Sequence, residues 1–218
     1  MKIFVTGASG YVGKVVVEHA VRAGHVVEGL ARNQESAAKV SQLGARPVVG
    51  DLRSFDVLAA AASRADAILH LAYIHDFSLD HSIVIDTEVK AVTALATGAR
   101  GKPIITTSGT AVAAPAPDGG ETDETAPINE GFVLGKRARA ERAVLDLTKL
   151  GAHIVSVRLP RKAKTIMMRC NRRARFTRCF AVRLAAIIVI ISHFFIAVAE
   201  LQSAPRLSHS GYRASILS

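Results

Sequence analysis

Residues 6–13, which read TGASGYVG, constrain the fold more than any other part of this sequence. They follow a short apolar, β-branched run and precede a segment with helical hydrophobic spacing, residues 11–23. In this context Gly7 allows a tight turn, Gly10 lets the backbone approach a pyrophosphate, and Gly13 lets the helix pack closely on the strand. Backbone amides and the positive end of the helix dipole then face the phosphates. The stretch therefore predicts a turn between strand and helix that binds a dinucleotide.

Six strand-like runs alternate with helix-like segments over residues 1–160. The predicted strands are 2–6, 26–31, 46–50, 67–72, 103–107 and 153–159, and the predicted helices are 11–23, 35–43, 55–63, 79–97 and 132–150. Gly98 is the expected stop of the fourth helix, and the proline-containing, acidic residues 113–130 are expected to form a loop. Such alternation indicates parallel strands joined by right-handed crossovers, with ligands beyond the carboxyl ends of the strands. We expect an α/β fold, a Rossmann-type doubly wound parallel sheet.

The sequence changes character after Pro160. Residues 161–218 hold 11 basic residues and one acid, whereas residues 1–160 hold 17 of each sign, so the net charge of +10 belongs to the tail. Leu184–Ala199 is nearly all apolar, but as a helix it spans roughly 24 Å, short of the roughly 30 Å hydrocarbon core of a bilayer. Three interpretations stay open. The tail is an aberrant translation, such as a frameshift, that truncates the domain before a substrate domain; or it is a membrane-associated helix; or it is a buried helix with a disordered basic end.

Composition argues against several classes of function. The arginines of the tail lack interleaved aromatic residues, so we expect no nucleic-acid partner. Cys170 and Cys179 have no metal-binding spacing with histidines, so we expect no metal site. The first apolar run reaches a glycine within five residues of Lys2, which is too short for a signal peptide. We expect a cytoplasmic location, with membrane association through residues 184–199 as the alternative.

The GxxGxxG spacing of residues 7–13, with a threonine in front, resembles the short-chain dehydrogenase/reductase superfamily, in its extended branch of NAD(P)-dependent epimerases and dehydratases. The resemblance covers residues 1–160 and implies an NAD(P)-binding domain there; from Arg161 onward the sequence departs from the family pattern. The cofactor-binding residues that it implies are Gly7, Ser9, Gly10, Tyr11, Val12 and Gly13 at the turn, Asp51 and Leu52 at the adenine, Leu71 and Ala72 at the ribose, Thr107 at the end of the fifth strand, and Lys136 at the nicotinamide ribose.

The end of the second predicted strand indicates which dinucleotide is bound. An acid there would bind the ribose 2′-hydroxyl and repel a 2′-phosphate. The sequence instead places Arg32 after the strand, with Glu28 earlier in it. An arginine can form charge-assisted hydrogen bonds to a phosphate, so we expect NADP rather than NAD. A solvated loop arginine is the alternative interpretation of Arg32.

The resemblance implies that three side chains carry the chemistry: a tyrosine acid, a lysine four residues later that shifts the phenol's pKa, and a serine or threonine that orients the substrate. Lys136 occupies the lysine position, but Phe132 stands at the tyrosine position and has no proton to give. The hydroxyl position falls on Ser108 or on Gly109, depending on a shift of one residue. The expected catalytic set is therefore incomplete.

Tyr73 and His75 are the candidates for a substitute acid. They lie in the stretch HLAYIHDF, residues 70–77, which resembles an atypical subgroup of the family that also lacks the tyrosine. A histidine side chain titrates near neutral pH and so suits proton transfer. The alternative is that one of these residues packs under the nicotinamide and the other is an exposed loop histidine.

Together these patterns predict an NADP-dependent oxidoreductase or epimerase-like protein that acts on a small-molecule carbonyl or hydroxyl substrate. The replacement of the tyrosine by Phe132 predicts impaired activity. The alternative function is a non-catalytic NAD(P)-binding regulatory or sensor protein.

Overall fold

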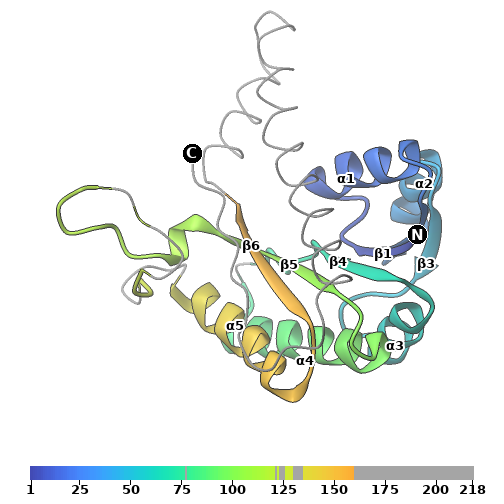
Figure 1. The fold of residues 1–218 in the computed structure, drawn as a ribbon. Coiled ribbons are helices and arrows are strands. Elements are labelled where there is room, and N and C mark those ends of the chain that lie inside the picture. Colours follow the sequence, from blue (N-terminus) through green and yellow to red (C-terminus); the bar gives the residue numbers. More distant parts are fainter. Residues whose placement is uncertain (77, 121, 123–125, 130–134, 160–218) are drawn as a thin grey trace, which may run out of the picture.

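The computed structural model describes residues 1–76, 78–120, 122, 126–129 and 135–159. Six parallel strands form one sheet with helices on both faces (Figure 1). The strands are β1 (Lys2–Thr6), β2 (Val26–Ala31), β3 (Arg46–Val49), β4 (Ala67–His70), β5 (Ile104–Gly109) and β6 (Ile154–Leu159). The helices are α1 (Tyr11–Arg22), α2 (Gln34–Gln42), α3 (Phe55–Arg64), α4 (His81–Ala99) and α5 (Gly135–Asp146), with 3-10 turns η1 (Thr110–Val112) and η2 (Leu147–Leu150).

The strand order is β3-β2-β1-β4-β5-β6. The chain first adds strands on one side of β1 and then, from β4 onward, on the other side. The point where the order reverses is the gap between the carboxyl ends of β1 and β4, which is where ligands bind in sheets of this kind. The predicted Rossmann-type doubly wound sheet is therefore confirmed.

β1 lies between β2 and β4 and shows how the sequence divides the core. Successive side chains of a strand point to opposite faces, so Ile3 and Val5 share one face and Phe4 lies on the other. Ile3 and Val5 pack with residues of α1 and α2, whereas Phe4 packs with residues of α3, α4 and α5. Because helices cover both faces, Ile3–Val5 of β1 form a continuous apolar run rather than an alternating one.

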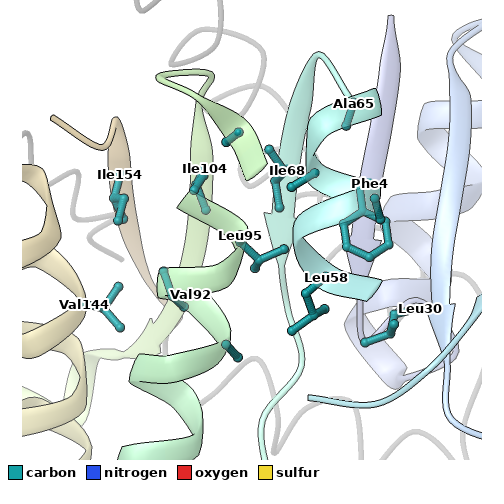
Figure 2. Close-up of a cluster of buried hydrophobic side chains, with 14 of the residues drawn as sticks. Phe4, Leu30, Leu58, Ala65, Ile68, Val92, Leu95, Ile104, Val144 and Ile154 are labelled. Atoms are coloured by element: carbon teal, nitrogen blue, oxygen red, sulfur yellow. The ribbon is translucent and has the colours of Figure 1, made fainter. Parts of the chain in front are cut away.

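The core cluster that contains Phe4 lies between the sheet and the three helices α3, α4 and α5 (Figure 2). Figure 2 shows Phe4, Ile68 and Ile104 pointing from three neighbouring strands toward Leu58 and Leu95 on the helices. All five side chains are fully buried, and burying a side chain of this size stabilises the fold by roughly 1.5–3 kcal/mol. This packing fixes the relative positions of β1, β4 and β5, whose carboxyl ends carry the candidate site.

Gly98 lies inside α4, so the prediction that it ends this helix is wrong. The helix continues to Ala99 and is capped by Arg100, which adopts a left-handed backbone with φ of 51°. A Cβ at Gly98 would lie 2.1 Å from the carbonyl oxygen of Ala59 in α3. The glycine is therefore required by the close approach of two helices, a contact between segments that local sequence patterns do not reveal.

Other predicted boundaries moved by a few residues. β4 ends at His70, before Leu71 and Ala72, which were expected inside the strand, and β5 extends to Gly109. The described part of the last predicted helix comprises α5 and the 3-10 turn η2, whereas residues 132–134 lie outside the described residues. The ends of helices are decided by capping and fraying, which local hydrophobic patterns do not encode.

The predictions for the tail fall on residues 161–218, which lie outside the described residues. They include the apolar segment 184–199, and the two cysteines lie there as well. Among the helices that the structure does describe, none combines the length and the apolar character needed to cross a membrane.

The contact at Gly98 predicts an unusual sign for a stability change. In an ordinary helix interior, replacing glycine by alanine stabilises a protein by about 1 kcal/mol. Here the added Cβ meets the backbone of α3, so we expect Gly98→Ala to lower the free energy of unfolding by about 2 kcal/mol. Urea denaturation followed by circular dichroism measures this change. Thr97→Ala at an exposed neighbouring position is the control, expected to stay within about 0.5 kcal/mol. Equal or higher stability of Gly98→Ala would contradict the close packing of α3 on α4.

Candidate functional site

The turn after β1 passes unusually close to the chain that leaves β4. Gly7 adopts a left-handed backbone with φ of 72°, and a Cβ there would lie 2.8 Å from the nitrogen of Ala72 and 2.9 Å from the carbonyl carbon of Leu71. Only glycine satisfies both the backbone conformation and the lack of space. The sequence prediction that Gly7 makes a tight turn agrees with this geometry.

Gly13 brings the first turn of α1 close to the backbone of Gly7 in the turn after β1. A Cβ at Gly13 would lie 2.0 Å from the carbonyl oxygen of Gly7. The N-cap of α1 is Gly10, which has no side chain to cover the first amides of the helix and donates its own N–H to Gly7 at 2.9 Å. Ser9 is half-buried, Val12 packs against the core, and Tyr11 is exposed. The start of α1 thus has the bare backbone that an anionic phosphate group requires.

Arg32 stands directly after β2, at the start of α2. Asn33 caps this helix: its side chain accepts a hydrogen bond from the backbone N–H of Ser36, and the Ser36 hydroxyl lies 3.1 Å from the backbone nitrogen of Asn33. The cap stabilises the backbone conformation at the start of α2. The Arg32 side chain is exposed to solvent. A guanidinium is therefore presented beside the carboxyl end of β2, the position at which a 2′-phosphate was expected.

Asp51 and Leu52 follow β3 and play different structural roles. The carboxylate of Asp51 accepts hydrogen bonds from the backbone N–H of Arg53 at 2.8 Å and from the Ser54 hydroxyl at 3.1 Å. These bonds order the turn that leads into α3. Leu52 is buried in the core cluster beneath the sheet. Their predicted contacts with adenine stay a prediction.

Thr6 and His70 join the ends of β1 and β4. The two residues are register partners in the sheet, and Thr6 Oγ1 lies 2.9 Å from His70 Nδ1. Thr6 Oγ1 also accepts a hydrogen bond from the backbone N–H of Ala72 at 3.3 Å. Both side chains are buried, at 0% and 1% exposure. The glycine turn and the segment after β4 are therefore bonded to one another at the point where the sheet order reverses.

Glu88 of α4 places a buried carboxylate between two basic groups. Its Oε1 lies 3.5 Å from His70 Nε2 and 3.6 Å from Arg137 Nη1 of α5. Burial by itself raises the pKa of the Glu88 carboxyl, but the charges of His70 and Arg137 outweigh burial and hold this pKa below its ordinary value. The site thus contains a fixed buried anion.

Arg137 reaches from α5 to the ends of two strands. Its Nη2 donates a hydrogen bond to the carbonyl oxygen of Thr107 in β5 at 2.5 Å. Its guanidinium carbon lies 3.8 Å from the centroid of the Tyr73 ring, which in turn lies edge-on to the His75 ring at 5.1 Å between centroids. Tyr73 is half-buried and His75 is exposed. The structure therefore brings together Tyr73, His75 and Thr107, three of the residues predicted from sequence.

Ser108 belongs to a second buried charge cluster. Its hydroxyl donates to Glu141 Oε2 of α5 at 2.9 Å, and Glu141 Oε1 accepts a hydrogen bond from Arg158 Nε of β6 at 3.0 Å. The Glu141 and Arg158 side chains are only 5% and 6% exposed. With its proton directed to Glu141, the Ser108 hydroxyl retains lone pairs with which to accept a hydrogen bond. Its predicted role in orienting a substrate stays a prediction.

Two positions of the family's catalytic pattern, the tyrosine position at Phe132 and the lysine position at Lys136, stay predictions. Phe132 lies outside the described residues. For Lys136 the structure defines the backbone position, the second residue of α5, and not the side chain. In the described part of the chain there is no group of three or more side chains arranged to hold a metal ion.

Sequence reasoning missed the four charged residues Glu88, Arg137, Glu141 and Arg158. A signal was present for Glu88, which interrupts the buried stripe of α4 that includes Val84, Ala91 and Leu95. Arg158 likewise sits in a strand whose neighbours are all apolar or small. A charged residue inside an apolar stripe is nearly always paired, but the sequence does not say with what.

Comparison with known proteins gives the family and its extent. The sequence profile of the NAD dependent epimerase/dehydratase family matches residues 3–162. An uncharacterized protein of Schizosaccharomyces pombe is 40% identical over 114 residues, which is 51% of this chain and 38% of that protein. The 4-hydroxy-2-methyl-3-oxo-4-farnesyl-3,4-dihydroquinoline-1-oxide ketoreductase of Stigmatella aurantiaca is 32% identical over 166 residues, which is 72% of this chain and 49% of that protein.

Solved structures show the same architecture. The crystal structure of gox2253 superposes with a TM-score of 0.63 at 28% sequence identity, covering 76% of this chain and 56% of that one. The chain spans about half the length of the curated relatives it matches.

The depressed pKa of Glu88 predicts how stability depends on pH. A carboxyl whose pKa is lower in the folded than in the unfolded protein stabilises the fold above the unfolded pKa, and this contribution is lost as pH falls through the folded pKa. We expect Glu88→Gln to cost about 3–5 kcal/mol near neutral pH, because Arg137 is left buried without its anion. We also expect the variant to lose less stability than the parent on acidification below about pH 4.5.

Urea denaturation across this pH range measures both effects. Glu35→Gln, on the exposed surface of α2, is the matched control, since solvent screens its pair with Lys39. Parallel pH profiles for Glu88→Gln and the parent protein would contradict a buried, ionised Glu88.

Proposed function

Because this chain belongs to the NAD-dependent epimerase/dehydratase family, we propose that it is an NADP-dependent oxidoreductase acting on a small-molecule carbonyl or the corresponding hydroxyl. The observation that carries the proposal is the turn from Gly7 to Gly13, where missing Cβ atoms leave bare backbone at the start of α1. A relative that is named as a ketoreductase and is 32% identical supports carbonyl chemistry.

In the proposed complex, the dinucleotide lies along the carboxyl edge of the sheet. The turn residues Gly7, Ser9, Gly10, Tyr11, Val12 and Gly13 surround the phosphates, Asp51 and Leu52 lie beside the adenine, Leu71, Ala72 and Thr107 line the riboses, and Lys136 binds the nicotinamide ribose. When bound, the dinucleotide supplies the hydride that adds to the carbonyl carbon and leaves as the oxidised form. The protein itself binds, orients and supplies the proton.

Arg32 favours NADP over NAD. Its guanidinium is exposed beside the capped start of α2, and an arginine can bind a phosphate through two parallel hydrogen bonds. Glu28, the acid nearest to this place in β2, pairs with Arg64 at 3.2 Å. That pairing directs Glu28 away from the role of binding a ribose hydroxyl.

Tyr73 is the proposed acid. As hydride adds to the carbonyl carbon of the substrate, the phenol proton passes to the carbonyl oxygen, giving an alcohol and leaving a phenolate that takes a proton back from solvent. His75, whose ring lies edge-on to Tyr73 and is exposed, is the proposed route for that proton. The Ser108 hydroxyl donates its proton to Glu141, so in the reverse direction it orients the hydroxyl form of the substrate by accepting a hydrogen bond from it.

The alternative is a non-catalytic NADP-binding sensor. One sequence feature favours it: Phe132 stands where the family carries its tyrosine acid. In this case the dinucleotide site is retained and Tyr73 only packs beside the nicotinamide.

The choice of dinucleotide is testable at Arg32. We expect Arg32→Asp to weaken NADPH binding by about 10- to 100-fold, because charge-assisted hydrogen bonds are lost and a like charge is introduced. NADH binding is expected to be unchanged or tighter. Isothermal titration calorimetry measures both, and Arg22→Asp on the far end of α1 is the control for net charge. If NADPH and NADH respond alike to Arg32→Asp, the proposed phosphate site is wrong.

The choice between enzyme and sensor is testable at Tyr73. We expect the protein to oxidise NADPH with some members of a panel of aldehydes and ketones, and Tyr73→Phe to lower kcat by about 100-fold or more. Phe132→Tyr restores the family pattern and is expected to raise turnover. If neither the parent nor Phe132→Tyr turns over any substrate while NADPH still binds, the oxidoreductase proposal is wrong and the non-catalytic alternative is favoured.

A further inference from the structure

We propose that Arg137 is a positioning residue whose guanidinium, held in place by the buried carboxylate of Glu88, fixes the ring of Tyr73 at the carboxyl edge of β4. The inference rests on the proposed function, in which Tyr73 is the acid, and adds the group that sets its orientation. The Arg137 guanidinium carbon lies 3.8 Å from the Tyr73 ring centroid, well inside the range of a cation–π contact.

Arg137 is itself held by two other elements. Nη2 donates to the carbonyl oxygen of Thr107 on β5, and Nη1 faces Glu88 Oε1 of α4 at 3.6 Å. The side chain is 14% exposed, so water competes little for these contacts. Because the guanidinium is planar and rigid, two anchors on different elements restrict both its position and its rotation. The Tyr73 ring, whose centroid lies 3.8 Å from the guanidinium carbon, is thereby held against a fixed group.

Glu88 is the anion that determines where the guanidinium lies. Arg137 Nη1 and His70 Nε2 are buried, and among the described residues neither atom has a hydrogen-bond partner, so their shared ion-pair partner is Glu88 Oε1. His70 is bonded through its other nitrogen to Thr6. A continuous series of side chains therefore runs from Thr6 beside the glycine turn, through His70, Glu88 and Arg137, to Tyr73.

The contact between Arg137 and the Tyr73 ring matters because Tyr73 lies in a segment without regular secondary structure. A phenol there transfers its proton only while it points at the reacting oxygen, and small displacements of a catalytic group lower rates strongly. An arginine stays charged at all working pH values, so it holds the ring without exchanging a proton itself. Its loss should lower kcat and leave the affinity for the dinucleotide nearly unchanged.

The position of the ring can be read without any activity. The chain has three tyrosines and no tryptophan, so protein labelled with 3-fluorotyrosine gives three ¹⁹F resonances, and Tyr73→Phe assigns one of them. We expect Arg137→Met to shift the Tyr73 resonance toward that of free fluorotyrosine while the other two stay in place. Arg137→Lys, which keeps the charge and loses the planar fork, should give an intermediate shift. Arg139→Met, exposed on the same helix, is the matched control and should change none of the three.

Kinetics then separate positioning from general structure. With a substrate identified as above, we expect Arg137→Met to lower kcat by about 30-fold, which corresponds to about 2 kcal/mol, with the Kd for NADPH changed by less than about threefold. Arg137→Lys should recover part of the loss. In a Tyr73→Phe background, Arg137→Met should have no further effect on residual turnover, because it acts only through Tyr73.

Two results would overturn the inference. One is a Tyr73 resonance whose chemical shift is unchanged in Arg137→Met. The other is a loss of kcat on Arg137→Met that is as large in the Tyr73→Phe background as in the parent protein. A parent protein that binds NADPH and turns over no carbonyl would remove the proposed oxidoreductase function instead. In that case the ¹⁹F spectra still decide whether Arg137 holds the ring.

Discussion

The rest of the site depends on the absence of a Cβ at Gly7. Because that atom is missing, the turn after β1 can lie against the backbone of Leu71 and Ala72, the segment that leaves β4. The contact is locked from the sheet side by Thr6, whose hydroxyl bonds both the His70 ring and the Ala72 amide. The loop expected to bind phosphates and the segment that carries Tyr73 are thus parts of one packed junction, at the point where the strand order reverses.

Buried charge is the second organising element. Glu88 with Arg137 and Glu141 with Arg158 form two ion pairs beneath the carboxyl edge of the sheet, each linking α5 to another element. Burial of such pairs contributes little net stability, because desolvation offsets most of the attraction, but a buried charge without its partner is costly. The pairs connect α5 to α4 and to β6 at defined positions. In this arrangement Arg137 faces Tyr73 and Glu141 engages Ser108.

The proposed enzyme and the proposed sensor require the same dinucleotide site. Both need the glycine turn, the capped start of α2 and the close approach at Gly7. They differ in whether a proton donor stands at the nicotinamide edge. Phe132 has no proton to supply, so the proposed enzyme depends on Tyr73, whose ring centroid lies 3.8 Å from the Arg137 guanidinium carbon.

The sequence by itself determined the order and type of the elements, because alternating apolar runs and glycine punctuation are local signals that fix a doubly wound sheet. It also located the turn at Gly7 and the exposed Arg32. It misassigned Gly98, since glycine is selected both by helix ends and by helices that touch, and only the packing of α4 on Ala59 distinguishes the two. The partners of Glu88 and Arg137 were decided by tertiary structure alone. They lie on α4, α5, β4 and β5, far apart in the chain, and an ion pair between distant segments leaves no periodic trace in the sequence.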